Sequence, residues 1–177
     1  IVQAINSLLT VLMNMILIGY GSVAVSVLGV YFKLQSFVFM PVFGLGNGMV
    51  AIIGYNYGAR LRNRIYDGVK VSLTYAVVIM AIGTILFWAF PEFLMGLFET
   101  SGEAASELTT IGVPALRTIS LSFIMAAVGI TLSNVFQAIG KGTYSLLMSL
   151  MRQLIVLLPA AWLLSNLGGL SAIWWSF

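Results

Sequence analysis

Residues 33–64 read KLQSFVFMPVFGLGNGMVAIIGYNYGARLRNR, and this stretch decides the fold class of the chain. Its apolar part is long enough to cross a bilayer, which takes about 20 residues. Pro41 and several glycines interrupt it midway, and it ends in Arg60, Arg62 and Arg64. Interruptions at membrane depth are tolerated where neighbouring helices or a cavity satisfy the freed backbone groups. The stretch therefore predicts a spanning helix that bends at mid-depth and stops at a charged cytoplasmic face.

The composition of the whole chain points to the same class. Hydrophobic residues make up 60% of it, charged residues only 7%, and the mean hydropathy is +1.07. Soluble domains carry about 25% charged residues, so this chain has too little polar surface to cover a soluble globule. We predict an all-α polytopic membrane protein. Its 8 lysines and arginines are scattered among apolar spans, which argues against a nucleic-acid partner.

Apolar runs separated by turn residues predict five spans and the start of a sixth. We expect helices at about residues 1–18, 23–57, 69–90, 109–139 and 143–164, with a truncated one over 170–177. Both ends of the chain fall inside apolar runs, so we expect a fragment of a larger membrane protein. The second helix would be roughly 52 Å long if straight. Because a bilayer core is about 30 Å thick, this helix must tilt, bend or protrude.

Charges between the spans set the orientation. Four cations lie on one side of the expected bundle, in a loop and in a turn that is two crossings away. These are Arg60, Arg62, Arg64 and Lys141. The acidic loop at 91–107 lies on the other side. Because cytoplasmic loops carry an excess of Lys and Arg, we interpret the four cations as topology determinants at the cytoplasmic surface.

Polar side chains inside the spans fall on helical faces. On the first helix they recur at i, i+3, i+4, i+7 and i+11 from Gln3 to Asn14, and the second carries a similar face from Lys33 to Asn47. Polar groups are expensive in a bilayer, so such faces indicate a cavity wall. The candidate cavity residues are Asn6, Thr10, Asn14, Lys33, Ser36, Met40, Asn47, Asn134 and Arg152. The alternative is that each of these side chains forms a hydrogen bond between two helices, which stabilises the bundle by about 0.6 kcal/mol.

Proline and glycine residues on the second helix are expected to bend it or to let it pack closely. Pro41 removes a backbone hydrogen bond and clashes with the preceding turn. Gly44 and Gly48 form a GxxxG pattern, which is typical of close helix packing. Gly54 and Gly58 complete this hinge and packing group near the arginine end.

The expected third helix differs from the others. Apart from Ser72, Thr74 and Thr84, its side chains are apolar all round. We therefore expect it to face lipid, while the first, second, fourth and fifth helices turn polar faces to one another or to a water-filled cavity.

No expected span holds a carboxylate or a histidine. All five carboxylates lie in expected loops, at Asp67, Glu92, Glu99, Glu103 and Glu107. Use of a proton or sodium gradient normally needs an embedded titratable or anionic group, so such a site should lie outside this fragment or use backbone carbonyls. The chain also lacks cysteine and histidine. We therefore expect that the protein has no catalytic residues, no metal site and no cofactor, and that it is not an enzyme.

Three segments carry a resemblance to a known family. MPVFGLGNGMVAIIGYNYGARLRNR (40–64), GVPALRTISLSF (112–123) and NVFQAIGKGTYSLLMSLMRQLIVLLPAAWLL (134–164) resemble the C-terminal half of multidrug and toxic compound extrusion (MATE) transporters. The resemblance implies that 1–177 is the C-terminal six-helix lobe of a twelve-helix antiporter. It also implies alternating-access export of amphipathic, often cationic drugs in exchange for protons or sodium, in the bacterial plasma membrane. The implied partners are these drugs, membrane lipid and the missing N-terminal lobe.

The chain departs from the family at one point that bears on mechanism. Some members carry an acidic residue on the helix that corresponds to 1–18, whereas this chain has Asn6 and Asn14 there. The coupling ion, proton or sodium, therefore stays open, and we expect its site outside this fragment. Two other functions also stay open. One is a lipid-linked oligosaccharide flippase of the same superfamily, and the other is a non-transporting membrane bundle.

Overall fold

The computed structural model describes residues 2–19, 21–98 and 103–176, all of which lie in helices or short connections. The side chains of 2–6, 9, 103–108, 153–154, 165 and 167–171 are not described. The order of elements is α1 (Val2–Ile18), α2 (Ser22–Gly58), α3 (Arg62–Ala89), α4 (Pro91–Gly96), α5 (Glu103–Ser120), α6 (Phe123–Ala138), α7 (Gly142–Leu150), η1 (Met151–Leu157), α8 (Leu158–Ile173) and η2 (Trp174–Ser176). The predicted all-α class is confirmed.

Several helices are long and apolar enough to cross a membrane. In the described part of the chain these are Ser22–Gly58, Arg62–Ala89 and Gly142–Leu164. The pair Thr109–Ser120 and Phe123–Ala138, bent by 49°, would make a fourth span. α1 has 17 residues, or about 25 Å at about 1.5 Å per residue.

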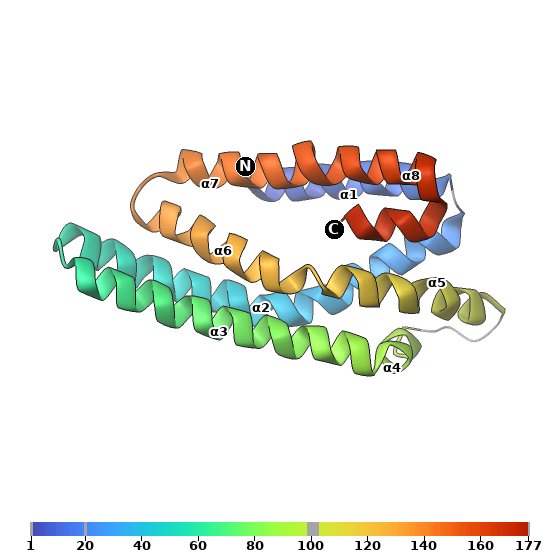
Figure 1. The fold of residues 1–177 in the computed structure, drawn as a ribbon, viewed down its shortest axis with the longest axis horizontal. Coiled ribbons are helices and arrows are strands. Elements are labelled where there is room, and N and C mark those ends of the chain that lie inside the picture. Colours follow the sequence, from blue (N-terminus) through green and yellow to red (C-terminus); the bar gives the residue numbers. More distant parts are fainter. Residues whose placement is uncertain (1, 20, 99–102, 177) are drawn as a thin grey trace.

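The helices form two groups that lie side by side (Figure 1). α1 contacts α7, η1 and α8 in one group, while α2, α3 and α6 contact one another in the second. α5 packs against α2, α3 and the short α4. The α2–α3 and α6–α7 turns lie at one end of the bundle, and α4 lies at the opposite end (Figure 1). The arginine-rich turn and the Lys141 turn therefore share an end, as the predicted orientation requires.

Both turns at this end close in the same way. Arg60 follows α2 with a left-handed φ of 57°, and Gly140 follows α6 with a φ of 77°. In each turn the next residue donates its N–H to a carbonyl five residues back, at N···O distances of 3.0 and 2.9 Å. This is the Schellman arrangement, in which glycine normally occupies the left-handed position. The turn is short, so Arg62 and Arg64 belong to the first turns of α3, which begins seven residues before the predicted 69.

The helix predicted over 109–139 is divided. α5 ends at Ser120, α6 starts at Phe123, and the two halves are bent by 49°. The Phe123 ring packs edge-on against Phe39 of α2 and Phe87 of α3, with ring centroids 5.2 Å apart in both pairs. Edge-to-face aromatic pairs add about 0.5–1.5 kcal/mol beyond their burial. The break is thus fixed by packing against two other helices, which local sequence does not reveal.

The fifth span also departs from its prediction. It contains a π-helical segment, η1, between α7 and α8. The turn expected at 165–169 is not observed, because α8 runs unbroken to Ile173 before η2 begins. Glycines can stay inside a helix in a membrane because backbone groups there have no water to bond to and the helix itself satisfies them. The residues expected to open a sixth span therefore belong to α8 and η2.

Candidate functional site

One face of α2 is left uncovered by the other helices of the chain. Lys33, Ser36, Met40 and Asn47 are all exposed, and Met40 is 73% exposed. The opposite side of the same helix is buried, as Val42 with an exposure of 2% shows. The sequence predicted that the four exposed residues share one face of the helix. The structure places them together on the uncovered side of α2.

The polar groups on this face differ in where they point. The Ser36 hydroxyl donates to the Phe32 carbonyl of its own helix at 2.7 Å, which satisfies it locally. The Lys33 ammonium lies 5.5 Å from the centroid of the Phe98 ring, just beyond α4. Long cationic side chains can place their charge well away from their backbone position. Lys33 is thereby drawn towards the α4 end of the bundle.

The candidates on α1 are described only in part. Thr10 and Asn14 are half-buried. Asn6 belongs to α1, but its side chain lies outside the described residues. Assignment of these three residues to a cavity wall therefore stays a prediction.

Asn134 lies in a helix–helix contact. It is half-buried on α6, and its amide lies against Gly46 of α2. A Cβ on Gly54, two turns further along α2, would lie 3.3 Å from the Ala138 carbonyl oxygen of α6. By contrast, a Cβ on Gly44 or Gly48 would have no described neighbour within 4 Å. The close packing expected of the GxxxG pattern is thus found at Gly46, two positions from each of these glycines, and again at Gly54.

Arg152 lies in the π-helical segment η1. Its side chain is exposed, and one guanidinium nitrogen, Nη1, lies 3.8 Å from where a Cβ on Gly129 of α6 would sit. It is also close enough to the buried Tyr31 of α2 to interact with it electrostatically. Single π-helical turns occur often at functional sites. Arg152 therefore remains a candidate for the cavity, at a junction of three helices.

The hinge candidates lie along α2. Pro41, Gly44 and Gly48 are exposed, and the helix continues through them without a break. Figure 1 shows that α2 changes direction along its length. Gly44 and Gly48 line a groove of about 700 Å³ between α2 and α3, which also contacts Arg64 and Asp67 near the turn. Gly58 is exposed at the end of the helix.

The four topology cations are all exposed. Lys141 lies over the ring of Tyr144, 5.7 Å from its centroid, at the start of α7. Among the described residues, no three acidic, histidine or cysteine side chains are grouped closely enough to hold a metal ion.

A cluster of polar side chains lies between α6 and α7, and its residues were not among the predicted cavity residues. Ser145 is buried, and its hydroxyl bonds to that of Ser133 across the two helices. The Gln137 amide also donates to the Ser145 hydroxyl at 3.0 Å. These are interhelical hydrogen bonds of the kind that hold membrane helices together. The i, i+4 spacing of Ser133 and Gln137 was the available signal.

A second feature that the sequence did not reveal secures the break between α5 and α6. The Thr84 hydroxyl of α3 lies 2.9 Å from the Met80 carbonyl and 3.1 Å from the Ser120 carbonyl. The Trp88 Nε1–H donates to the Arg117 carbonyl at 3.2 Å. A helix end leaves carbonyls unsatisfied, and a bilayer offers no water for them. Thr84 and Trp88 of α3 place donors at these carbonyls, and the Arg117 carbonyl also accepts from the Ser120 hydroxyl at 3.0 Å.

The chain matches known transport proteins over most of its length. A family model described as MatE matches residues 1–163. The multidrug export protein MepA of Staphylococcus saprophyticus is 29% identical over 167 residues, which are 93% of this chain and 35% of that protein. MepA of Staphylococcus haemolyticus is 28% identical over 163 residues, 92% of this chain and 35% of that protein. This chain thus spans about a third of the length of these relatives.

Solved structures show the same arrangement of helices. A crystal structure of MATE in complex with MaL6 superimposes with a TM-score of 0.92 at 22% identity, over 99% of this chain and 39% of that one. An outward-facing multidrug resistance MATE family transporter of the MOP superfamily gives 0.90 at 21% identity, over 99% and 39%. At this level of identity the likeness establishes the fold.

Proposed function

The chain belongs to the MATE (MatE) family, and we propose that it forms one lobe of a multidrug exporter in the bacterial plasma membrane. The relatives that it matches are named multidrug export proteins and are about three times as long. The remaining length would supply the second lobe. In this proposal the two lobes enclose a cavity that opens alternately to the two sides of the membrane, and efflux of amphipathic, often cationic drugs is coupled to protons or sodium.

The uncovered face of α2 is the observation that supports this proposal most directly. Ser36, Met40 and Asn47 lie on it together, whereas the opposite side of the helix packs into the lobe. A polar face exposed to hydrocarbon would be costly, so a water-containing cavity is its natural neighbour. Methionine is flexible and polarisable, which suits a surface that contacts many different drugs.

Asp67, in the second turn of α3, is the acidic residue that the described candidate spans contain. Asp67 lies beside the groove near the α2–α3 turn, and Glu92 lies in α4 at the opposite end. Proton or sodium coupling normally uses an embedded anionic group. We therefore propose that the coupling site lies in the part of the transporter outside this chain.

Transport in vesicles tests the proposal. The whole transporter is reconstituted, and uptake of a fluorescent amphipathic cation is followed under an imposed proton gradient or an imposed sodium gradient. We expect one gradient to drive uptake, and we expect Asn47→Ala to reduce uptake more than a change on the lipid side of α3, such as Ile82→Ala. No gradient-driven uptake by an inserted and folded transporter would contradict the proposal.

A flippase for lipid-linked oligosaccharides is the second function in this superfamily that we weighed. Its cavity should be strongly basic to hold a phosphate. Lys33 and Arg152 are the cations nearest mid-depth in the described spans, and Lys33 is drawn to Phe98 at one end. Drug export therefore fits the chain better.

A further inference from the structure

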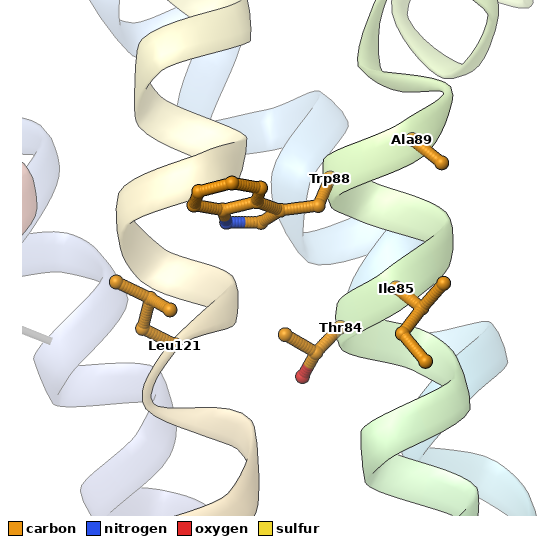
Figure 2. Close-up of a pocket in the computed structure, with 5 residues that line it drawn as sticks. All are labelled: Thr84, Ile85, Trp88, Ala89 and Leu121. Atoms are coloured by element: carbon orange, nitrogen blue, oxygen red, sulfur yellow. The ribbon is translucent and has the colours of Figure 1, made fainter.

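An apolar pocket of about 400 Å³ lies where α3 passes the break between α5 and α6. It is lined by Thr84, Ile85, Trp88, Ala89 and Leu121. Figure 2 shows Trp88 reaching from α3 towards the neighbouring bent helix, which carries Leu121. The volume lies within the range of about 300–1,000 Å³ that is usual for small-molecule sites.

The pocket opens on a surface suited to lipid. Ile82, Ile85 and Leu86 of α3 are 54%, 64% and 45% exposed, and Trp88 is 53% exposed. Tryptophan is enriched where a membrane protein crosses from hydrocarbon to headgroups, and Trp88 lies one residue before the end of α3. This position near the end of α3 suits contact with an acyl chain close to its headgroup.

An arginine, Arg117, lies beside the pocket. The Arg117 guanidinium carbon lies 6.0 Å from the centroid of the Trp88 ring, and the side chain is exposed. Its guanidinium makes no ion pair with a carboxylate among the described side chains, Asp67 and Glu92 included. An arginine can bind a phosphate through two parallel hydrogen bonds. The pocket thus combines an apolar slot with an exposed arginine beside it.

We propose that this pocket binds an anionic phospholipid, with an acyl chain between α3 and the α5–α6 break and the phosphate on Arg117. The acyl chain would cover Thr84 and Trp88, whose hydrogen bonds stabilise the break between α5 and α6. Bound lipid would then shield those bonds from water at the membrane surface. The proposal depends on the lobe lying in a membrane and not on the transporter exporting drugs.

Photolabelling in nanodiscs tests this site. The whole transporter is placed in nanodiscs with phosphatidylglycerol or phosphatidylcholine that carries a diazirine on one acyl chain, and labelled peptides are mapped by mass spectrometry. We expect phosphatidylglycerol to label the segment 84–89 and Leu121 at least about fivefold more than phosphatidylcholine does. Such a preference needs less than the about 1.4 kcal/mol that corresponds to a tenfold difference in affinity. Ala89→Trp fills the pocket and should abolish this labelling, whereas Ile82→Trp on the same helix should not.

The role of the cation is tested separately. Arg117→Gln should remove the preference for phosphatidylglycerol and leave weak labelling by both lipids. Lys70→Gln, which removes an exposed cation from the other end of α3, should keep the preference. Equal labelling by the two lipids in the unmodified transporter overturns the proposal. So does an absence of labelling at 84–89, which would show that protein covers the pocket.

Discussion

Gly46 of α2 lies directly against Asn134 of α6. A Cβ on Gly46 would lie 3.1 Å from Cγ of Asn134 and closer still to its amide nitrogen. The two helices can approach this closely only because position 46 has no side chain. The contact joins the last turns of α6 to the helix that carries the uncovered polar face.

Gly46→Ala should loosen this contact. Asn134 can turn away, so we expect the free energy of unfolding of the whole transporter to fall by about 1 kcal/mol, the low end for overpacking. Chemical unfolding in mild detergent measures it. Asn134→Ala combined with Gly46→Ala should recover part of the loss, because the obstructing amide is gone. Gly48→Ala is the matched control, since nothing described lies within 4 Å of its added Cβ, and an equal loss there would contradict the assignment.

The membrane class was predictable because it rests on composition and on the lengths of apolar runs. The seam at Gly46 was not, because GxxxG spacing names two glycines without saying which face of the helix meets a partner. Leu121 and Ser122 did not predict a break either, since neither is a proline or a glycine. Phe123 fixes that break through Phe39 and Phe87, which are far away in the sequence.

The candidate cavity residues show the same limit. Helical periodicity correctly grouped Lys33, Ser36, Met40 and Asn47, because neighbours on one helix follow from its geometry. Periodicity could not place Asn134, because its surroundings depend on how α2 and α6 are arranged. The direction of Lys33 likewise depends on Phe98, which follows α4.

Alanine at Gly83 should destabilise the protein more than alanine at Gly46 does. A Cβ on Gly83 of α3 would meet both methyl groups of Val38 on α2, with the Val38 Cβ only 3.3 Å away. Valine has few alternative rotamers in a helix, so Gly83→Ala should cost about 1–3 kcal/mol of unfolding free energy. Val38→Ala should rescue it. A smaller loss than that of Gly46→Ala would show that α3 can shift away from α2.

The hydrogen bonds at the break should contribute measurably to stability. Thr84→Val keeps the shape of the side chain but removes the donor to the Ser120 carbonyl. We expect a loss of about 0.6–2 kcal/mol, the range for interhelical hydrogen bonds in membranes. Thr74→Val is the control, because its hydroxyl donates to the Lys70 carbonyl of its own helix and to no other described residue. A similar effect of both changes would assign no special role to the break.

Pro41 should matter for transport more than for insertion. Its missing N–H weakens the middle of α2, and the helix changes direction along its length (Figure 1). Pro41→Ala should therefore slow drug export while membrane insertion, measured as the amount of folded protein in purified membranes, stays the same. Ala51→Pro offers the reverse comparison, since it puts a break into the arginine half of the helix. Unchanged drug resistance of cells that carry Pro41→Ala would contradict a functional bend.

Arg60 occupies a left-handed position that glycine fills in the matching turn after α6. For a residue with a side chain this conformation costs about 1–2 kcal/mol, so Arg60→Gly should raise the free energy of unfolding by about 1 kcal/mol, less than the full cost because glycine also gains freedom in the unfolded chain. Arg62→Gly removes the same charge from a helical position of α3 and should lower stability instead. If both changes shift stability in the same direction, charge and not backbone conformation governs this turn.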